Sequence, residues 1–335
     1  MTRSEALFSA FQNQRVLVVG DAMLDAYMWG KIERTSPEAP VPIVDITRRE
    51  VRLGGAANVA LNVKALGGEP VLCALLGNDH YASAFLEEMD KAQLETSGVL
   101  KVAHHPTTVK TRIIAENKHV LRVDEEDTSS WMNPRDLSNH IIDQMIANKP
   151  DLLIFEDYDK GVLCGDCISD VMDFAREHGI PVAVDPKHKN FKLYRGADLF
   201  KPNLRELKDG VTQHELHPDH PETLRAAVCG LAEEMGLHRV LLTLSEHGMG
   251  LWNRESAEWL REPAHKREIT DVSGAGDTSI TAAAMALAAG ASDHELLALA
   301  NLAGGLVCEY PGVVPIDAQR LKNGFNQWLE AHADA

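Results

Sequence analysis

An eight-residue segment, Asp271-Val272-Ser273-Gly274-Ala275-Gly276-Asp277-Thr278, carries the residue types that phosphoryl chemistry requires. Two glycines one residue apart precede an aspartate, and an alanine-rich apolar segment follows, as in a tight turn that leads into a helix. A helix N-terminus presents unpaired backbone N–H groups and partial positive charge, so it binds phosphate-like anions. An aspartate beside such an anion can accept the proton of an attacking hydroxyl. The segment therefore predicts an anion cradle at Gly274, Ala275 and Gly276, with Asp277 as the catalytic base.

The same segment also has a purely structural interpretation, because aspartate is common in the first turn of a helix. Other phosphate-binding signatures are missing from the sequence. It contains no G-x-x-x-x-G-K-[ST] segment, and the first apolar strand leads into Gly20-Asp21-Ala22 and not into G-x-G-x-x-G. The H-R-D and D-F-G segments of protein kinases are missing as well. Any phosphate site is therefore expected at the late glycine turn.

Composition limits the partners that the chain can bind. It has 335 residues, 44% hydrophobic and 25% charged, which is typical of a globular protein with a large core. The net charge of −17 argues against nonspecific binding to nucleic acid or anionic membranes. No apolar run approaches the roughly 18–20 residues of a membrane helix, so no membrane insertion is expected. The N-terminus lacks the pattern of a signal peptide, and a cytoplasmic location is the default expectation.

Clusters of cysteine and histidine give little support for a metal site. Cys164-Gly-Asp-Cys167 has the spacing of a redox or zinc pair, but no second cysteine pair accompanies it. His214, His217 and His220 lie among prolines and an aspartate, which favours a solvated loop over a rigid set of ligands. Neither cluster is expected to bind a metal.

Apolar strands and helical segments alternate along most of the chain. Strands are expected near residues 16–19, 71–76, 152–155, 182–184, 199–200 and 240–244, and helices near 54–66, 82–92, 166–178, 282–289, 296–307 and 321–329. Continuous apolar strands that alternate with helices predict an α/β three-layer sandwich around a mostly parallel central sheet. No repeat or linker divides the chain, so residues 1–335 are expected to form a single domain.

Two stretches depart from this alternation. Within residues 27–53 and 107–125, β-forming residues alternate with charged ones, a pattern that predicts antiparallel strands with one solvated face. A small β-sheet assembled from these two insertions is expected to cover the active site as a lid.

Five segments resemble, in order, the signatures of the ribokinase-like carbohydrate kinase family. They are residues 54–58 (GGAAN), 185–187 (DPK), 203–206 (NLRE), 243–248 (TLSEHG) and 271–278 (DVSGAGDT), and together they span nearly the whole chain. One such segment would be weak evidence, whereas five in the family's order are specific. The resemblance implies a ribokinase-like fold and transfer of the γ-phosphate of ATP to a sugar hydroxyl.

Three segments are similar, more narrowly, to the kinases of heptose 7-phosphate: residues 36–42 (SPEAPVP), 54–60 (GGAANVA) and 158–163 (YDKGVL). This resemblance implies phosphorylation of the anomeric (C1) hydroxyl of D-glycero-D-manno-heptose 7-phosphate to the 1,7-bisphosphate, in the synthesis of ADP-heptose for the lipopolysaccharide core. Some relatives carry a fused nucleotidyltransferase domain. The sequence has no H-x-G-H segment of that type, so a stand-alone kinase is expected, although a truncated chain would look the same.

The resemblance places ATP and Mg²⁺ beside the third and fourth segments. Asn203 and Glu206 share one face of a helical turn, and Glu206 is implied to hold Mg²⁺ largely through water. A capping box would produce the same pair of residues. Many relatives have glycine at the position of Ser245. The implied cofactor-binding residues are Asn203, Leu204, Arg205, Glu206, Thr243, Ser245, Gly248 and, more weakly, Asn301.

On the sugar side, the resemblance implies hydroxyl-binding positions at Asp25, Gly54, Gly55 and Asn58. A carboxylate and an amide suit paired hydroxyls, because one accepts two hydrogen bonds and the other both donates and accepts. The distal phosphate also needs cations. The candidates are Arg112 on the predicted lid, and Lys160 and Lys187, which follow core strands. Solvated surface charge is the ordinary role of any single lysine or arginine.

Further expectations come from the resemblance alone. Some relatives bind a monovalent cation such as K⁺ beside the glycine turn, where Asp271 and Ser273 would contribute. A lid with an apolar strand face implies a homodimer formed through that face. Two alternatives stay open: a kinase for a different sugar or sugar phosphate, and a nucleotide-binding regulator without catalysis. Asp277 argues against the regulator, because a protein that only binds nucleotide has no need of it.

Overall fold

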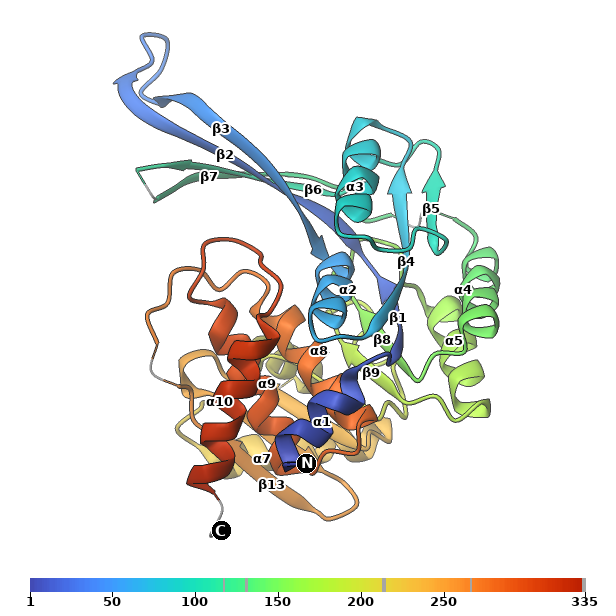
Figure 1. The fold of residues 1–335 in the computed structure, drawn as a ribbon. Coiled ribbons are helices and arrows are strands. Elements are labelled where there is room, and N and C mark those ends of the chain that lie inside the picture. The colour runs from blue at the N-terminus through green and yellow to red at the C-terminus, as the bar shows by residue number, and fades with distance from the viewer. Residues whose placement is uncertain (117, 130–131, 213–214, 266, 333–335) are drawn as a thin grey trace.

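The computed structural model describes residues 1–116, 118–129, 132–212, 215–265 and 267–332. Within these residues the strands form two sheets (Figure 1), one of nine strands in the order β13-β12-β11-β10-β9-β8-β1-β4-β5 and one of four in the order β3-β2-β6-β7. In the large sheet, all pairs from β11 to β5 are parallel, and β12 and β13 add an antiparallel edge. The predicted α/β sandwich with a mostly parallel sheet is confirmed.

The strands of the large sheet coincide with the apolar runs of the sequence. They are β1 (Arg15–Gly20), β4 (Glu69–Gly77), β5 (Val99–Val102), β8 (Leu152–Glu156), β9 (Val182–Asp185), β10 (Leu199–Phe200), β11 (Arg239–Thr243), β12 (Met249–Asn253) and β13 (Glu258–Glu262). The sequence analysis did not predict β5, β12 and β13. These strands lie at the two ends of the sheet, where polar residues or a glycine interrupt the apolar pattern.

Helices cover both faces of this sheet. They are α1 (Arg3–Phe11), α2 (Ala56–Ala65), α3 (His80–Lys91), α4 (Pro134–Asn148), α5 (Gly165–Glu177), α6 (Leu204–Val211), α7 (Pro221–Met235), α8 (Ala275–Ala288), α9 (Asp293–Val307) and α10 (Ala318–Ala331). One core cluster joins the sheet to α1, α2, α3, α8, α9 and α10, and a second joins it to α4, α5, α6 and α7. Among the described residues, none of the helices combines the length and apolar character needed to cross a bilayer.

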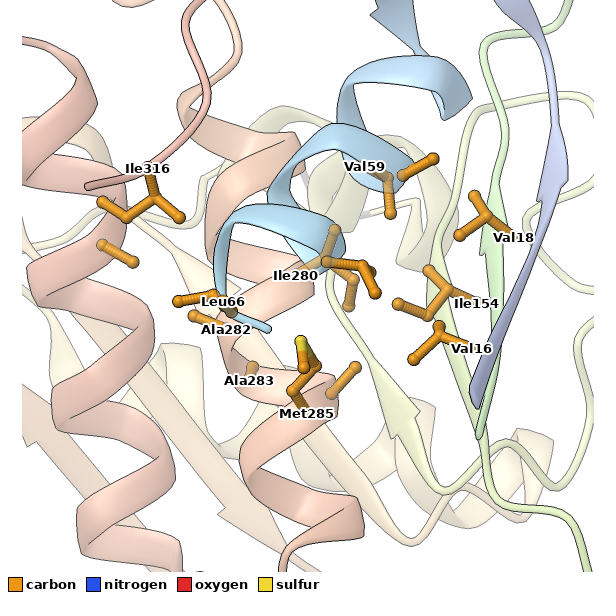
Figure 2. Packing of buried hydrophobic residues seen from close by; sticks show 14 of the residues in the cluster. Val16, Val18, Val59, Leu66, Ile154, Ile280, Ala282, Ala283, Met285 and Ile316 are labelled. Carbon is orange, nitrogen blue, oxygen red and sulfur yellow. The ribbon is translucent and has the colours of Figure 1, made fainter. Parts of the chain in front are cut away.

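Strand β1 shows how one apolar run serves both cores. Val16 and Val18 pack with α2 and α8 (Figure 2), whereas Leu17 and Val19 face the opposite cluster. All four side chains are buried, and burying an aliphatic side chain stabilises the fold by about 1.5–3 kcal/mol. The period of two along a strand therefore explains why a continuous apolar run predicts a sheet covered on both sides.

Helix α8 lies in the interior and places the glycine turn at the carboxyl edge of the sheet. Its alanines are buried on every side, which is the pattern of a helix surrounded by other elements. Gly274 precedes the helix with φ 79°, a left-handed conformation that glycine adopts without a Cβ clash. The chain therefore turns sharply at Gly274 before the helix starts at Ala275.

The second sheet contains β2 (Ala22–Thr35), β3 (Pro42–Gly55), β6 (Val109–Ala115) and β7 (Lys118–Glu125). It projects away from the body of the molecule as a long twisted arm (Figure 1). Each insertion forms an antiparallel hairpin, but the hairpins join through β2 and β6, which run parallel. The expectation of antiparallel strands is therefore correct within each hairpin and wrong between them. Both first strands leave the core sheet in the same direction, so they pair parallel.

Candidate functional site

The candidate site lies where the parallel strands end. Asp21 follows β1, and Glu156 ends β8 directly before Asp157 and Tyr158. Asp185 ends β9, and Lys201 follows β10. Of these residues, Glu156, Tyr158, Asp185 and Lys201 lie beside the first turn of α8, because the carboxyl ends of parallel strands share one edge of the sheet. In α/β sheets, ligands bind in the crevice outside these ends.

Asp277 is held in this edge by two side chains from distant parts of the sequence. Its Oδ2 accepts a hydrogen bond from Asn58 Nδ2 at 2.8 Å, and its Oδ1 accepts one from Tyr158 Oη at 2.7 Å. The side chain is buried, and burial raises the pKa of Asp277, which the two hydrogen bonds partly counter. A raised pKa makes the ionised carboxylate a better proton acceptor, as a general base requires.

The predicted anion cradle has the geometry of an open helix N-terminus. Ala275 N–H donates to the Val272 carbonyl at 3.3 Å, and Thr278 N–H to that of Gly274 at 3.0 Å. Within the described part of the chain, no protein group accepts from the backbone N–H of Gly276 or Asp277, and no side chain caps the helix. These N–H groups are therefore available to an anion.

Three buried carboxylates surround the cradle. One oxygen each from Glu156, Asp185 and Asp277 lies within 4.8 Å of the other two. Lys201 Nζ lies 2.7 Å from Asp185 Oδ2, whereas neither oxygen of Glu156 has a hydrogen-bond partner among the described residues. Burial and the adjacent Asp185 and Asp277 raise the pKa of Glu156 well above its ordinary value, so this side chain holds a proton more tightly than an exposed glutamate does.

On the nucleotide side, Asn203 and Glu206 form the capping box of α6. Asn203 Oδ1 accepts from Glu206 N at 2.9 Å, and Glu206 Oε2 accepts from Asn203 N at 2.8 Å. Asn203 also forms an isolated bridge with Thr243, so the two predicted nucleotide segments lie side by side. Leu204 is half-buried against the core, and Arg205 is exposed. The capping role of Asn203 and Glu206 is therefore compatible with a role in nucleotide binding, because the cap fixes the orientation of the Glu206 carboxylate.

Lys187 lies at the boundary between the nucleotide and sugar sides. Its ammonium is 2.5 Å from Glu206 Oε1 and 5.1 Å from the centroid of the Tyr158 ring. Lys187 thus contacts the Glu206 carboxylate and also approaches the ring near which Lys110 lies, and its assignment to the sugar stays a prediction.

The backbone of the loop after β11 explains why many relatives have glycine where this chain has Ser245. Ser245 has φ 52° and Gly248 φ 82°, both left-handed. Serine adopts this conformation at a cost that glycine avoids, so the glycine of many relatives suits the same backbone. A Cβ on Gly248 would strike the Glu262 carbonyl. Asn301 is buried and donates from Nδ2 to the Pro263 carbonyl at 2.8 Å, so its amide supports the segment against which Gly248 packs.

On the sugar side, Asp25 forms an ion pair with Arg112 across the lid sheet, and both side chains are buried. A Cβ on Gly54 would strike the Asp25 carboxylate, which explains a glycine at that position. Gly55 ends β3 with φ 58° and is also the N-cap of α2, which starts at Ala56, so the predicted helix opening at the glycine pair is confirmed. The turn brings Asn58 to the base.

Further cations lie near the Tyr158 ring, beside the lid. Lys110, which the sequence analysis missed, lies with its Nζ 5.0 Å from the centroid of the Tyr158 ring. Burial lowers its pKa, and the nearby charges of Lys160 and Arg112 lower it further, although Asp25 opposes them. Lys160 Nζ is 2.7 Å from Glu126 Oε2. Lys110, Arg112 and Lys160 therefore form a cation cluster, in which like charges repel and an anionic ligand would relieve the repulsion.

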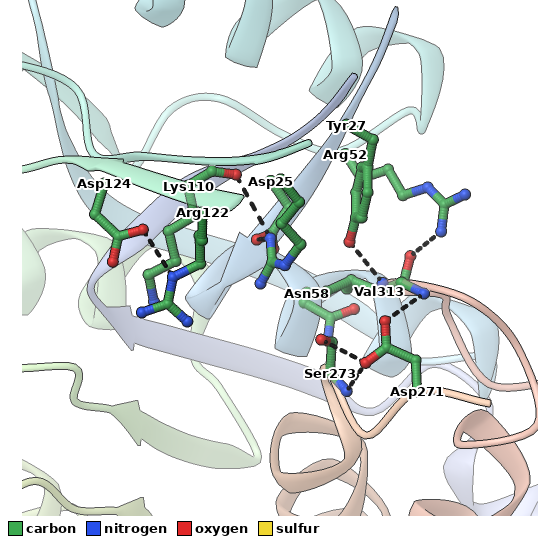
Figure 3. Close-up of polar contacts among 12 residues, drawn as sticks. Asp25, Tyr27, Arg52, Asn58, Lys110, Arg122, Asp124, Asp271, Ser273 and Val313 are labelled. Carbon is green, nitrogen blue, oxygen red and sulfur yellow. Dashed lines mark hydrogen bonds and ion pairs between the residues drawn. The ribbon is translucent and has the colours of Figure 1, made fainter. Parts of the chain in front are cut away.

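Asp271 connects the glycine turn to the loop after α9. Its Oδ1 accepts from Ser273 N and Oγ at 3.0 and 2.8 Å, and its Oδ2 accepts from Gly312 N at 2.9 Å. Arg52 of the lid donates to the carbonyls of Pro311 and Val313 at 2.9 and 3.0 Å. The lid, the loop and the glycine turn are therefore joined by direct contacts (Figure 3).

Several residues of this edge were missed as candidates, namely Asp21, Lys110, Glu156, Tyr158, Asp185 and Lys201. Asp21 accepts hydrogen bonds from the backbone N–H groups of Tyr158, Lys160 and Val162, so it positions the loop that carries Tyr158. Except for Lys110, all of them lie at or directly after the end of a parallel strand, a signal that the sequence contains. Of the rejected histidine cluster, His214 lies outside the described residues, and His217 pairs with Asp219 on the surface.

Comparison with known proteins agrees with this geometry. The profile described as pfkB family carbohydrate kinase matches residues 13–319. The "Bifunctional protein HldE" of Pelobacter propionicus is 37% identical over 335 residues, which are 99% of this chain and 66% of that protein. The protein of the same name from Alcanivorax borkumensis is 40% identical over 95% of this chain and 65% of its own length. The chain thus spans slightly less than two thirds of these relatives.

Solved structures share the fold at low sequence identity. Phosphofructokinase-2 from Escherichia coli in complex with potassium has a TM-score of 0.77 at 18% identity, and Arabidopsis thaliana ribokinase complexed with ribose and ATP has 0.71 at 19%. Each alignment covers 94% of this chain and 99% of the other. With the family profile matching most of the sequence and the glycine turn placed at the carboxyl edge of the sheet, the chain belongs to the pfkB family of carbohydrate kinases.

Proposed function

We propose that the protein phosphorylates the anomeric hydroxyl of D-glycero-D-manno-heptose 7-phosphate with ATP and produces the 1,7-bisphosphate. The observation that carries this proposal is the position of Asp277. It lies between an open helix N-terminus on one side and Asp25, Asn58 and the cation cluster on the other. A sugar hydroxyl at Asp277 would face a phosphate at the cradle.

The transfer itself follows from these positions. The hydroxyl oxygen attacks the γ-phosphorus as its proton passes to Asp277, the bond from that phosphorus to the β–γ bridging oxygen breaks, and ADP leaves. The backbone N–H groups of Gly276 and Asp277 would stabilise the charge on the phosphoryl oxygens. Tyr158 and Asn58 hold the carboxylate in place for the proton.

A carbohydrate kinase of this family uses ATP with a divalent metal, and we assign Mg²⁺ to the Glu206 side. The metal would neutralise phosphate charge and orient the nucleotide. Both oxygens of Glu206 already have partners, Asn203 N and Lys187 Nζ. A contact through water fits this arrangement, because direct ligation would displace one of these partners.

The heptose assignment rests on the resemblance of residues 36–42 and 158–163, and the cation cluster supports it. Lys110, Arg112 and Lys160 approach one another on the sugar side, so a substrate that carries its own phosphate suits this cluster better than a neutral sugar. The fixed charges would align the distal phosphate and thereby the C1 hydroxyl.

Three further proposals accompany this function. A monovalent cation such as K⁺ would bind where the 271–273 turn meets the loop around Gly312. A homodimer would form through the lid, where Val41, Leu121 and Val123 are exposed apolar residues. A cytoplasmic location would give the enzyme access to ATP. Dependence of turnover on K⁺ over Na⁺, and sedimentation of the wild type against Leu121→Lys, would test the first two.

The experiment for the function is a panel of candidate sugars with coupled detection of ADP. We expect turnover with heptose 7-phosphate to exceed turnover with unphosphorylated heptose and with other sugar phosphates. Preference for another sugar would assign the chain to a different kinase of the same family. Tight ATP binding with no turnover on any sugar would support a nucleotide-binding regulator. Detection of phosphate at C1 by ³¹P NMR would establish the position of transfer.

A further inference from the structure

Lys201 is a buried lysine at the anion cradle that the mechanism above does not use. It follows β10, its side chain is buried, and its Nζ lies 2.7 Å from Asp185 Oδ2. Burial alone would lower the pKa of Lys201, but the carboxylates of Asp185, Glu206 and Glu156 raise it above its ordinary value. The side chain therefore carries a full positive charge in a site from which water is excluded.

The ammonium faces the first turn of α8. A Cβ built on Gly276 would lie 3.5 Å from Lys201 Nζ and 3.6 Å from Asp185 Oδ2. The N-terminus of a helix carries partial positive charge, so a cation beside it is unfavourable. An anion placed between the ammonium and the unpaired N–H group of Gly276 would be attracted by both. This arrangement is what a binding site for a transferring phosphoryl group requires.

We propose that Lys201 is a catalytic residue whose ammonium moves from Asp185 to the γ-phosphoryl group when nucleotide binds. During transfer the lysine keeps its proton and stabilises the phosphoryl oxygens, while Asp277 takes the proton of the hydroxyl. The proposal rests on membership of the kinase family and on the cradle geometry. It does not depend on which sugar is the acceptor.

The neighbouring Glu156 explains how Asp185 can release the ammonium. Leaving a buried carboxylate without a partner is costly. Both oxygens of Glu156 are buried and unpaired within the described residues, and they adjoin Asp185 in the carboxylate cluster. The proton that Glu156 retains can be donated to Asp185 in place of the ammonium. Glu156 is therefore a positioning residue for this exchange.

The most direct test is a crystal structure of the wild-type protein with MgADP and fluoroaluminate, which mimics the transferring phosphoryl group. We expect Lys201 Nζ within hydrogen-bond distance of a fluorine atom, about 2.7–3.2 Å. An ammonium that stays on Asp185, out of reach of the fluoroaluminate, would overturn the proposal. This experiment needs no sugar, so its outcome is separate from that of the heptose assignment.

Variants test the same proposal in solution. Lys201→Met should lower kcat at least roughly 10²-fold, measured with the best sugar of the panel, while MgADP affinity stays within about threefold. The additional affinity that fluoroaluminate confers on MgADP should be lost, and Lys201→Arg should restore part of it. The matched control is Lys192→Met, which removes a surface ion pair with Glu234. If fluoroaluminate increases the MgADP affinity of folded Lys201→Met as much as it does that of the wild type, the lysine is only structural.

Discussion

Tyr158 Oη donates a hydrogen bond to Asp277 Oδ1 at 2.7 Å, although 119 residues separate the two along the chain. The backbone N–H of Tyr158 is held in turn by Asp21 Oδ2 at 2.8 Å. The position of the base is thus set jointly by the ends of β1 and β8 and by the first turn of α8. Burial raises the pKa of Tyr158 well above its ordinary value, so its hydroxyl remains a donor.

Replacement of the base should separate chemistry from binding. Asp277→Asn keeps the size of the side chain but cannot accept the proton, so kcat should fall at least roughly 10²-fold. Calorimetric titration with ATP should show nearly unchanged affinity. Asp219→Asn, a change at an exposed aspartate, serves as the control. Undiminished turnover in Asp277→Asn would place the base elsewhere.

Removal of the Tyr158 hydroxyl should change the pH dependence of catalysis. The hydrogen bond from Tyr158 stabilises the ionised form and so lowers the pKa of Asp277. In Tyr158→Phe that pKa should rise, and the acid limb of the kcat/KM profile should move to higher pH. Tyr194→Phe is the matched control, because its hydroxyl donates to Asp157 and not to the base. Superimposable acid limbs for wild type and Tyr158→Phe would refute this role.

The cation cluster of Lys110, Arg112 and Lys160 should determine affinity for the phosphorylated sugar. Lys110→Met removes one charged contact, worth about 1.5–3 kcal/mol, so KM for heptose 7-phosphate should rise roughly 10- to 100-fold. The KM for ATP should change little. Lys118→Met, at an exposed position of the same small sheet, tests whether any lid lysine has this effect. An equal rise in KM for the unphosphorylated sugar would mean that Lys110 does not contact the phosphate.

The pH dependence of the free energy of unfolding should reveal the proton held by buried Glu156. Because the pKa of Glu156 is raised in the folded protein, the fold retains a proton that the unfolded chain releases above the ordinary glutamate pKa. The contribution of Glu156 to the free energy of unfolding therefore falls as the pH rises from the ordinary glutamate pKa toward the raised pKa of the folded protein. The amide introduced by Glu156→Gln does not titrate, so the stability of this variant relative to wild type should increase as the pH rises above the ordinary glutamate pKa, as measured by urea denaturation. The exposed change Glu177→Gln should show no such trend.

Much of the fold could be predicted because its signals are local. The apolar runs of β1, β8 and β9 and the alanine-rich pattern of α8 each depend on neighbouring residues, so periodicity predicted them. The glycine turn at Gly274 was also local, since a left-handed φ and an exposed helix N-terminus need only a few residues. The edge strands β5 and β13 were missed because their pattern depends on which face the rest of the molecule covers.

The partners of charged side chains could not be predicted in the same way. The ion pair between Lys187 and Glu206 has no signal in the sequence, because the two residues are brought together only by the fold. Lys110 looked like an ordinary surface lysine, but the lid turns it toward Tyr158. A charge has no periodic signature, and its partner is fixed only when separate elements pack together.

The sequence by itself determined the family and the α/β architecture, and it predicted an anion cradle and a base at Asp277, because each is written in short segments whose order and spacing are visible. Only the tertiary structure decided what surrounds that base. Asn58 and Tyr158 reach Asp277 across 219 and 119 residues, and Lys201 meets Asp185 beneath Gly276. These contacts exist because parallel strands deliver their carboxyl ends to one edge, where burial strengthens the interactions among charges that are far apart in the chain.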